Sequence, residues 1–171
     1  MMSLRSLVVF VVLSSCSTLS FAADTHFRGI NCKSDLTKLM QGRSFPNEAV
    51  NAIEAKHRDL SLESLGSNVI ETSNDPINLS SWLVCGREYL LLEKKAVVRD
   101  VLASPFPNAE PQSEISRCVV DGRPDLRMVV WFTLDQNTEK TKLASQAWVV
   151  DDKKLKFVKL TAKVIQCESM R

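Results

Sequence analysis

The chain has few of the residues that common catalytic motifs require. It contains two histidines, His26 and His57, and neither has a second histidine four residues later, so the zinc-hydrolase helix motif is absent. Its five glycines are scattered and form no phosphate-binding loop, and no G-x-S-x-G sequence supplies a serine nucleophile. No cysteine pair has the C-x-x-C spacing of thioredoxin-like redox sites or zinc ribbons. The sequence therefore specifies no catalytic residue, cofactor or metal site.

Long apolar runs and an excess of one charge are also missing. The apolar run Leu7–Leu13 has seven residues, whereas a bilayer-spanning helix needs about 20. The chain has 22 basic and 20 acidic residues; without Arg5 in the leader, 21 stand against 20, a net charge of +1. Nucleic-acid binders normally show a basic excess. We therefore expect no nucleic-acid partner and no integral membrane segment after processing.

The first 22 residues have the pattern of an export signal. Arg5 supplies the positive start, Leu7–Leu13 form the apolar centre, and a small-residue cleavage site ends at Ala22. A second signal overlaps it: residues 13–16, LSSC, resemble the box of bacterial lipoproteins, in which residues 1–15 are removed and Cys16 is lipidated. We favour cleavage after Ala22, because residues 17–22 would make an unusually apolar tether. Either route exports the protein, to the periplasm or medium or to a lipid anchor in the cell envelope.

Four cysteines remain once Cys16 is removed or lipidated. Because exported compartments are oxidising, an even number of cysteines predicts two disulfides, and four cysteines allow three pairings. We favour Cys32–Cys85, which would tie the N-terminal segment to a central strand, and Cys118–Cys167, which would tie the last strand to an earlier one. Each would stabilise the fold by about 2–4 kcal/mol.

The hydrophobic period changes along the mature chain. Residues 34–42 and 45–58 carry apolar side chains at helical spacing and are joined by a tight connection, which predicts a helical hairpin. From residue 60 onward the pattern is that of strands, and Gly86 marks a bulge. The expected strands are 60–65, 81–92, 115–120, 126–134, 143–150 and 155–165.

Helices followed by strands favour an α+β fold. We predict that residues 23–171 form one globular domain, in which an N-terminal helical hairpin packs on an antiparallel sheet of five to seven strands that ends in a meander.

Aromatic and basic residues are the remaining candidates for function. Trp82, Trp131 and Trp148 all fall in expected strands, where aromatic residues usually belong to the core. We select Trp148, because both faces of its strand are apolar and one of them could stay exposed. A lysine run follows it, and such runs either protect a strand edge or attract an anionic surface. The predicted binding residues are Trp148, Lys154, Lys156 and Lys159.

Export, two disulfides and missing catalytic motifs favour a non-enzymatic periplasmic or cell-envelope protein that binds another macromolecule. Inhibitors and immunity-type proteins fit this description by analogy of size and export, not by a motif. Two alternatives stay open: a small hydrolase acting on envelope material, and a structural lipoprotein tethered through Cys16. A deep pocket lined by carboxylates or by His57 would favour the hydrolase, and an exposed surface near a tryptophan or the lysine run would favour binding.

Overall fold

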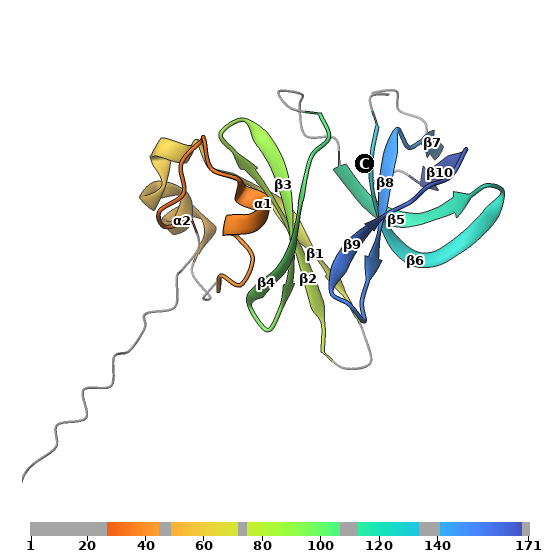
Figure 1. The fold of residues 1–171 in the computed structure, drawn as a ribbon, viewed down its shortest axis with the longest axis horizontal. Coiled ribbons are helices and arrows are strands. Elements are labelled where there is room, and N and C mark those ends of the chain that lie inside the picture. Colours follow the sequence, from red (N-terminus) through yellow and green to blue (C-terminus); the bar gives the residue numbers. More distant parts are fainter. Residues whose placement is uncertain (1–26, 45–48, 72–74, 107–112, 134–140, 169–171) are drawn as a thin grey trace, which may run out of the picture.

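The computed structural model describes residues 27–44, 49–71, 75–106, 113–133 and 141–168, which form a predominantly antiparallel β structure (Figure 1). A first sheet contains four strands in chain order: β1 (Glu63–Ile70), β2 (Ile77–Val84), β3 (Arg87–Lys94) and β4 (Val97–Ala103). A second sheet has the order β7 (Thr141–Leu143), β10 (Ile165–Glu168), β5 (Ser113–Val120), β6 (Arg123–Phe132), β8 (Gln146–Asp151) and β9 (Lys156–Lys159).

The predicted α+β fold, a helical hairpin on one sheet of five to seven strands, is wrong, because the described residues form a four-stranded and a six-stranded sheet. The described N-terminal region contains only the one-turn helix α1 (Leu36–Leu39), the seven-residue α2 (Val50–Lys56) and the 3₁₀ turn η1 (Arg58–Leu60). Neither α1 nor α2 has a side-chain cap. Residues 45–48 of the second expected helix lie outside the described residues. Helices this short are not stable from propensity alone, so the fold class follows from the strands and from tertiary packing.

The two serines at the starts of the expected helices, Ser34 and Ser44, do not cap helices in the structure. The hydroxyl of Ser34 accepts a hydrogen bond from the Asn31 amide (3.2 Å), which closes a turn before α1. Ser44 pairs with Val97 in an isolated β-bridge beside β4. A serine side chain forms hydrogen bonds with nearby backbone groups both in turns and at the start of a helix. A serine before an apolar stretch is therefore not a specific sign of a helix start.

Three hairpins turn through pairs of residues with positive φ. The pairs are Cys85-Gly86 (52° and 77°), Lys95-Ala96 (54° and 56°) and Asp121-Gly122 (48° and 80°). Two consecutive left-handed residues match the right-handed twist of a tight hairpin. The expected single strand 81–92 is therefore two strands, β2 and β3, and Gly86 lies in the turn and not in a bulge.

Three apolar layers hold the structure together. The first lies between the N-terminal segment and the first sheet, and it contains Phe27, Met40 and Trp82. The second lies between the two sheets and contains Leu90, Leu92 and Phe132. The first sheet is thus covered on both faces, with α1 and α2 on the side away from the second sheet (Figure 1).

The third layer covers the outer face of the second sheet. It contains Val129, Trp131 and Val149, with Leu160 and Ala162 packed against it. The expected strand 155–165 is divided: β9 ends at Lys159, residues 160–164 cross this face, and β10 pairs with β5 and β7. Alternating hydrophobicity in residues 158–164 thus reflects a crossing segment and not one continuous strand.

Both disulfides have the pairing that we favoured. Cys32–Cys85 joins the segment before α1 to the β2–β3 turn, and Cys118–Cys167 joins β5 to β10. Cys118 and Cys167 are register partners in neighbouring strands. The two bridges fasten the two sheets separately, and they are consistent with an extracellular or periplasmic location.

Candidate functional site

The structure brings together two of the four predicted binding residues. Trp148 on β8 and Lys159 on β9 are register partners, and the Lys159 ammonium lies 5.4 Å from the Trp148 ring centroid. On its other side Trp148 packs edge-on against Phe132, with ring centroids 5.5 Å apart. Trp148 is half-buried in the layer between the sheets, and part of its ring is covered by the chain's own lysine.

The other two predicted residues lie elsewhere. Lys156 is the register partner of Asp151. It is two residues before Val158 on β9, so both share the face of Val149, which is opposite to that of Trp148. Lys154 lies in the β8–β9 turn, with its ammonium 3.7 Å from the Asp151 carboxylate. The lysines therefore do not form a single face with Trp148, and their charge is partly balanced by Asp151.

The other residues weighed in the sequence have structural partners. Trp131 is fully buried, and its Nε1 donates a hydrogen bond to the Ser116 hydroxyl (3.0 Å). Trp82 is also buried and packs edge-on against Phe27, with centroids 5.3 Å apart. His57 lies at the end of α2, 6.0 Å from the same phenylalanine ring. Cys85 is in a disulfide and is not a thiol nucleophile, whereas His26 lies outside the described residues.

Two buried glutamates on β3 serve the structure. Glu88 accepts hydrogen bonds from the hydroxyls of Ser81 (2.7 Å) and Ser113, so it links the two sheets. Glu93 accepts from the Ser80 hydroxyl and the Asn78 amide (3.4 Å), and burial raises the pKa of Glu93 above its usual value. The β2–β3 register is regular from end to end, so these two carboxylates lie on opposite faces of β3 and do not form a catalytic pair.

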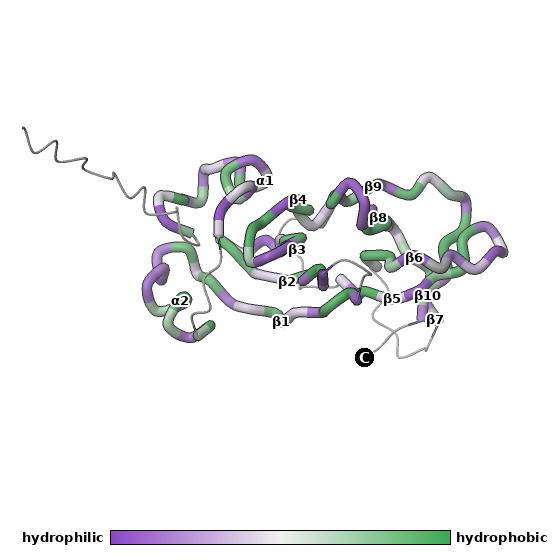
Figure 2. The backbone as a smooth tube through the Cα atoms, turned by 90° about the horizontal axis from the view of Figure 1, so that it is seen from below, coloured by the Kyte–Doolittle hydropathy of each residue, from purple (hydrophilic) through white to green (hydrophobic). Residues whose placement is uncertain are grey.

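The outer strand β4 of the first sheet is covered. The Gly42 amide donates to the Val98 carbonyl (2.8 Å), and the Val98 amide donates to the Arg43 carbonyl (2.9 Å). Further along, the Asp100 carboxylate accepts a hydrogen bond from the Phe157 amide of β9 (2.8 Å). This bond joins the outer strands of the two sheets on one side of the sandwich (Figure 2).

The outer strand β1 is the exposed counterpart on the other side (Figure 2). Its start is held by α2, because the Ser64 amide donates to the Glu54 carboxylate (2.9 Å). From Leu65 to Glu71, a stretch we call the β1 edge, no hydrogen bond joins the outward side to another part of the described chain. Gly66, Ser67 and Asn68 are exposed, and Val69 is 60% exposed.

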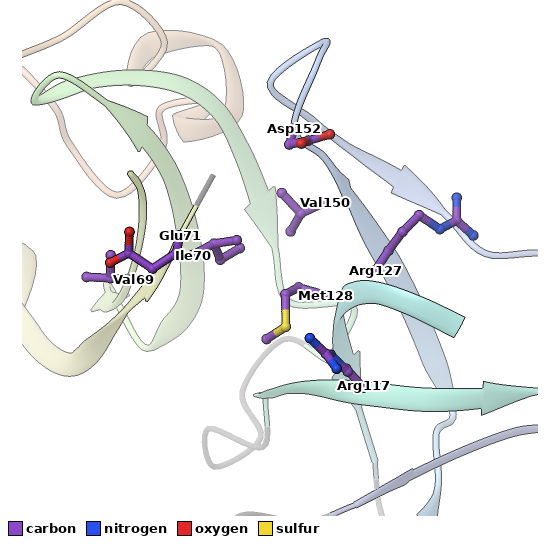
Figure 3. A pocket seen from close by; sticks show the side chains of 8 residues that line it. All are labelled: Val69, Ile70, Glu71, Arg117, Arg127, Met128, Val150 and Asp152. Carbon is purple, nitrogen blue, oxygen red and sulfur yellow. The ribbon is translucent and has the colours of Figure 1, made fainter. Parts of the chain in front are cut away.

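A cleft separates the end of β1 from the second sheet (Figure 3). This inter-sheet cleft has a volume of about 410 Å³ and contains Val69, Ile70 and Glu71 on the β1 side. The facing wall is formed by Arg117, Arg127, Met128, Val150 and Asp152. A second hollow of about 240 Å³, the edge pocket, is lined by residues 65–68 together with parts of β2, β3 and the start of β5, including the carboxylates of Glu88 and Glu114. The two hollows flank successive parts of the same strand.

The two arginines of the cleft differ in their partners. Arg127 is paired with Asp125 by two hydrogen bonds of 2.9 and 2.5 Å, and this pair lowers the pKa of Asp125. Its side chain points away from β1 (Figure 3). Arg117 is exposed, lies where the β5–β6 register shifts, and has no ion pair with the rest of the described chain. It lies beside Met128, so the cleft combines an apolar wall with one available cation.

Sequence reasoning missed the β1 edge for a specific reason. The expected strand 60–65 ended at Gly66, whereas β1 continues to Ile70 through a register shift between Ser64 and Gly66. Residues 66–70 alternate little, because the strand is exposed on both sides for much of its length. One signal in the sequence could have indicated this edge: residues 63–71 contain no lysine, arginine or proline, the residues that usually protect an outer strand.

Comparisons of the chain with protein-family models, curated proteins and solved structures find no match. In the part of the chain that the structure describes, no helix is both long and apolar enough to cross a membrane. The same residues contain no cluster of three or more potential metal ligands.

Proposed function

We propose that the protein is an exported, non-enzymatic protein that binds another protein in the periplasm or at the cell envelope. The proposed contact surface is the β1 edge with the inter-sheet cleft beside it. The observation that carries the proposal is the combination of seven consecutive residues without an outward backbone partner among the described residues and a 410 Å³ cleft at the end of that stretch.

The physical argument rests on the cost of leaving a strand edge exposed. Soluble proteins protect outer strands with lysine, proline, bulges, short length or a covering segment, because exposed edges promote aggregation. Among the residues that the structure describes, the β1 edge has one register shift near its start and no other such protection. An unprotected strand edge is expected where the strand pairs with a partner protein, because the partner then covers the exposed backbone groups. The disulfide in each sheet supports an oxidising, exported setting in which that partner would be met.

The predicted tryptophan–lysine residues remain a second proposed contact. Lys159 over the Trp148 ring presents a cation beside an aromatic surface, which would suit an anionic partner. Because the four residues lie on different faces, this contact would be smaller than the β1 edge.

Affinity capture from envelope extract with matched variants tests the proposal. Val69→Lys places a charge on the β1 edge, and Val158→Lys makes the same change on β9, where the valine is 46% exposed. We expect one defined protein to be captured by the wild type and by Val158→Lys, and to be lost with Val69→Lys. Capture that survives Val69→Lys but is lost with Lys159→Gln would move the contact to Trp148. Turnover of an envelope substrate that depends on one acidic residue would overturn the non-enzymatic assignment.

A further inference from the structure

We infer that the partner adds an extended segment to β1 as a fifth strand of the first sheet, and that this segment is apolar in its centre and basic at its ends. The inference rests on the proposed function and names the partner chemistry of the same site.

The backbone gives the first step of the argument. A strand added to a sheet edge gains its affinity from main-chain hydrogen bonds, which need a run of unpaired amides and carbonyls. The β1 edge offers such a run from Leu65 to Glu71. The described outer strands of the second sheet offer less: β7 has three residues, and β9 has four and gives its Phe157 amide to Asp100.

The two hollows give the second step. Successive side chains of a strand point to opposite faces, so every second side chain of an added strand would enter the space between the sheets. The edge pocket and the inter-sheet cleft occupy that space beside residues 65–68 and 69–71. At Gly66 the added strand would meet no side chain, and nothing lies within 4 Å of the place where a Cβ would be. Alternate side chains of the partner therefore have room on the inner face.

Charge selects the chemistry of the occupant. Between Arg58 and Arg87 the sequence has four acidic residues and no basic one. Asp75 is paired with Lys95 (3.3 Å), whereas Glu63 and Glu71, at the two ends of the strand, have no ion pair with the described residues. Opposite charges on neighbouring strands attract, so the ends of the partner segment are expected to be basic. The edge pocket beside residues 65–68 is lined by Leu79, Leu90 and Ile115, and these side chains favour an apolar centre. Met128, Val150 and Arg117 lie farther along the edge, beside residues 69–71.

The same charges disfavour a second copy of the chain as the occupant. A two-fold dimer that joins β1 to its copy brings the acidic residues of both copies to one seam, and the sequence between Arg58 and Arg87 has no basic residue to balance them. Like charges directly opposite each other destabilise such a pairing. The observations thus favour a different protein over self-association.

The test uses the whole mature protein and three synthetic peptides of the length of β1, eight residues. The first alternates valine and threonine between terminal lysines, the second has terminal glutamates instead, and the third is the lysine peptide with alternate backbone amides N-methylated. Binding is measured by calorimetry, and amide hydrogen exchange is followed by mass spectrometry. We expect the lysine peptide to slow exchange in residues 65–71, the glutamate peptide to bind about tenfold more weakly, and the methylated peptide to give no protection.

Several results would overturn the inference. Slowed exchange confined to residues 156–159, equal binding of the methylated peptide, or tighter binding of the glutamate peptide would each exclude a basic added strand. A concentration-dependent dimer that Val69→Lys abolishes would identify a second copy as the occupant. Val69→Glu, which keeps the acidic character, should retain the lysine peptide, whereas Val69→Lys should lose it, and both should unfold at a temperature close to that of the wild type because Val69 is exposed.

Capture and peptide binding together separate the two proposals. Loss of the captured protein with Val69→Lys, without any protection of residues 65–71 by the peptides, would retain the contact surface and reject strand addition. Capture unaffected by Val69→Lys would reject the contact surface itself.

Discussion

The outer strands β1 and β9 lie on opposite sides of the sandwich and are protected to different degrees. β9 has four residues, begins with Lys156, ends with Lys159, and gives its Phe157 amide to Asp100 of the neighbouring sheet. β1 has eight residues, contains no basic side chain, and is fastened outward only at Ser64 among the described residues. Short length, lysine and a covering contact are the usual ways to block unwanted pairing. In the described part of the chain, all three occur at β9 and none of them along the β1 edge.

This difference teaches where to look for function in a protein without catalytic motifs. When most of a molecule follows the rules of stable folding, the place that departs from them is a candidate functional site. The lysine run drew attention in the sequence, but in the structure it is the protected edge. The stretch before β2, which contains no basic residue and did not draw attention in the sequence, is the exposed one.

The largest expected effect comes from removing a disulfide at the far end of the second sheet. β7 pairs with β10, and its Lys142 lies 4.0 Å from the Glu114 carboxylate of β5. β10 makes three register pairs with β5, one of which carries the Cys118–Cys167 bond. Cys118→Ser with Cys167→Ser should lower the free energy of unfolding by about 4 kcal/mol, for a loop closed over 49 residues. It should also expose β5 as a new edge, which hydrogen exchange of residues 113–120 would report.

Cys32→Ser with Cys85→Ser is the matched control. Its bond closes a similar loop of 53 residues and should cost a similar free energy in urea unfolding, but β5 should keep slow exchange. Equal exchange of β5 in the two double variants would contradict the view that the second sheet depends on its own bridge.

The second effect tests whether Asp100 protects β9. Its carboxylate accepts the Phe157 amide (2.8 Å) and the Gln41 side-chain amide (3.2 Å). Asp100→Ala should cost about 1–3 kcal/mol, because it leaves the Phe157 amide without its acceptor. Exchange at residues 156–159 should become as fast as at the β1 edge. Asp152→Ala, an exposed carboxylate nearby, should change stability by less than about 0.5 kcal/mol, and an equal loss in both variants would argue against a specific tie.

Particular residues show which parts of this fold could be predicted from sequence. The two disulfides could be predicted because an even number of cysteines in a chain with an export-signal pattern indicates disulfide pairing. The turn at Asp121-Gly122 could be predicted because Asp-Gly is a well-known signature of a tight hairpin. The Lys95-Ala96 turn has no such signature, since neither residue favours positive φ, and its conformation is imposed by the pairing of β3 with β4.

The candidate site was harder to predict from the sequence than the strands and the disulfides. Trp148 was placed correctly in a strand. The face on which each lysine lies depends on the register of β8 with β9, which a one-residue shift would reverse. The β1 edge depends on which strand lies outermost, a property of the topology and not of any local pattern. Local sequence indicates strands, whereas edges are decided by the whole arrangement.

A third effect concerns how β1 is attached to the sheet. Ser80 and Asn78, the donors to Glu93, are register partners of Ser67 and Val69. Because burial raises the pKa of Glu93 above its usual 4.5, the folded state holds this proton more tightly than the unfolded state. The free energy of unfolding should therefore fall as the pH rises from below 4.5 through the raised pKa. Glu93→Gln should remove this fall, and urea unfolding at several pH values measures it; an unchanged pH dependence would contradict the assignment.

The smallest effect separates protection of β9 from binding at Trp148. Lys159→Met removes the cation 5.4 Å from the Trp148 ring and the 3.0 Å hydrogen bond to Gln146, while an apolar side chain still covers the ring. At this exposed position the loss should be about 0.5 kcal/mol, with a small change in tryptophan fluorescence. If Lys159 serves mainly to protect the edge, the variant should self-associate at high concentration in sedimentation experiments and still capture its partner through β1. A variant that stays monomeric and loses the partner would make Trp148 and Lys159 the contact, and β1 an unprotected edge without that role.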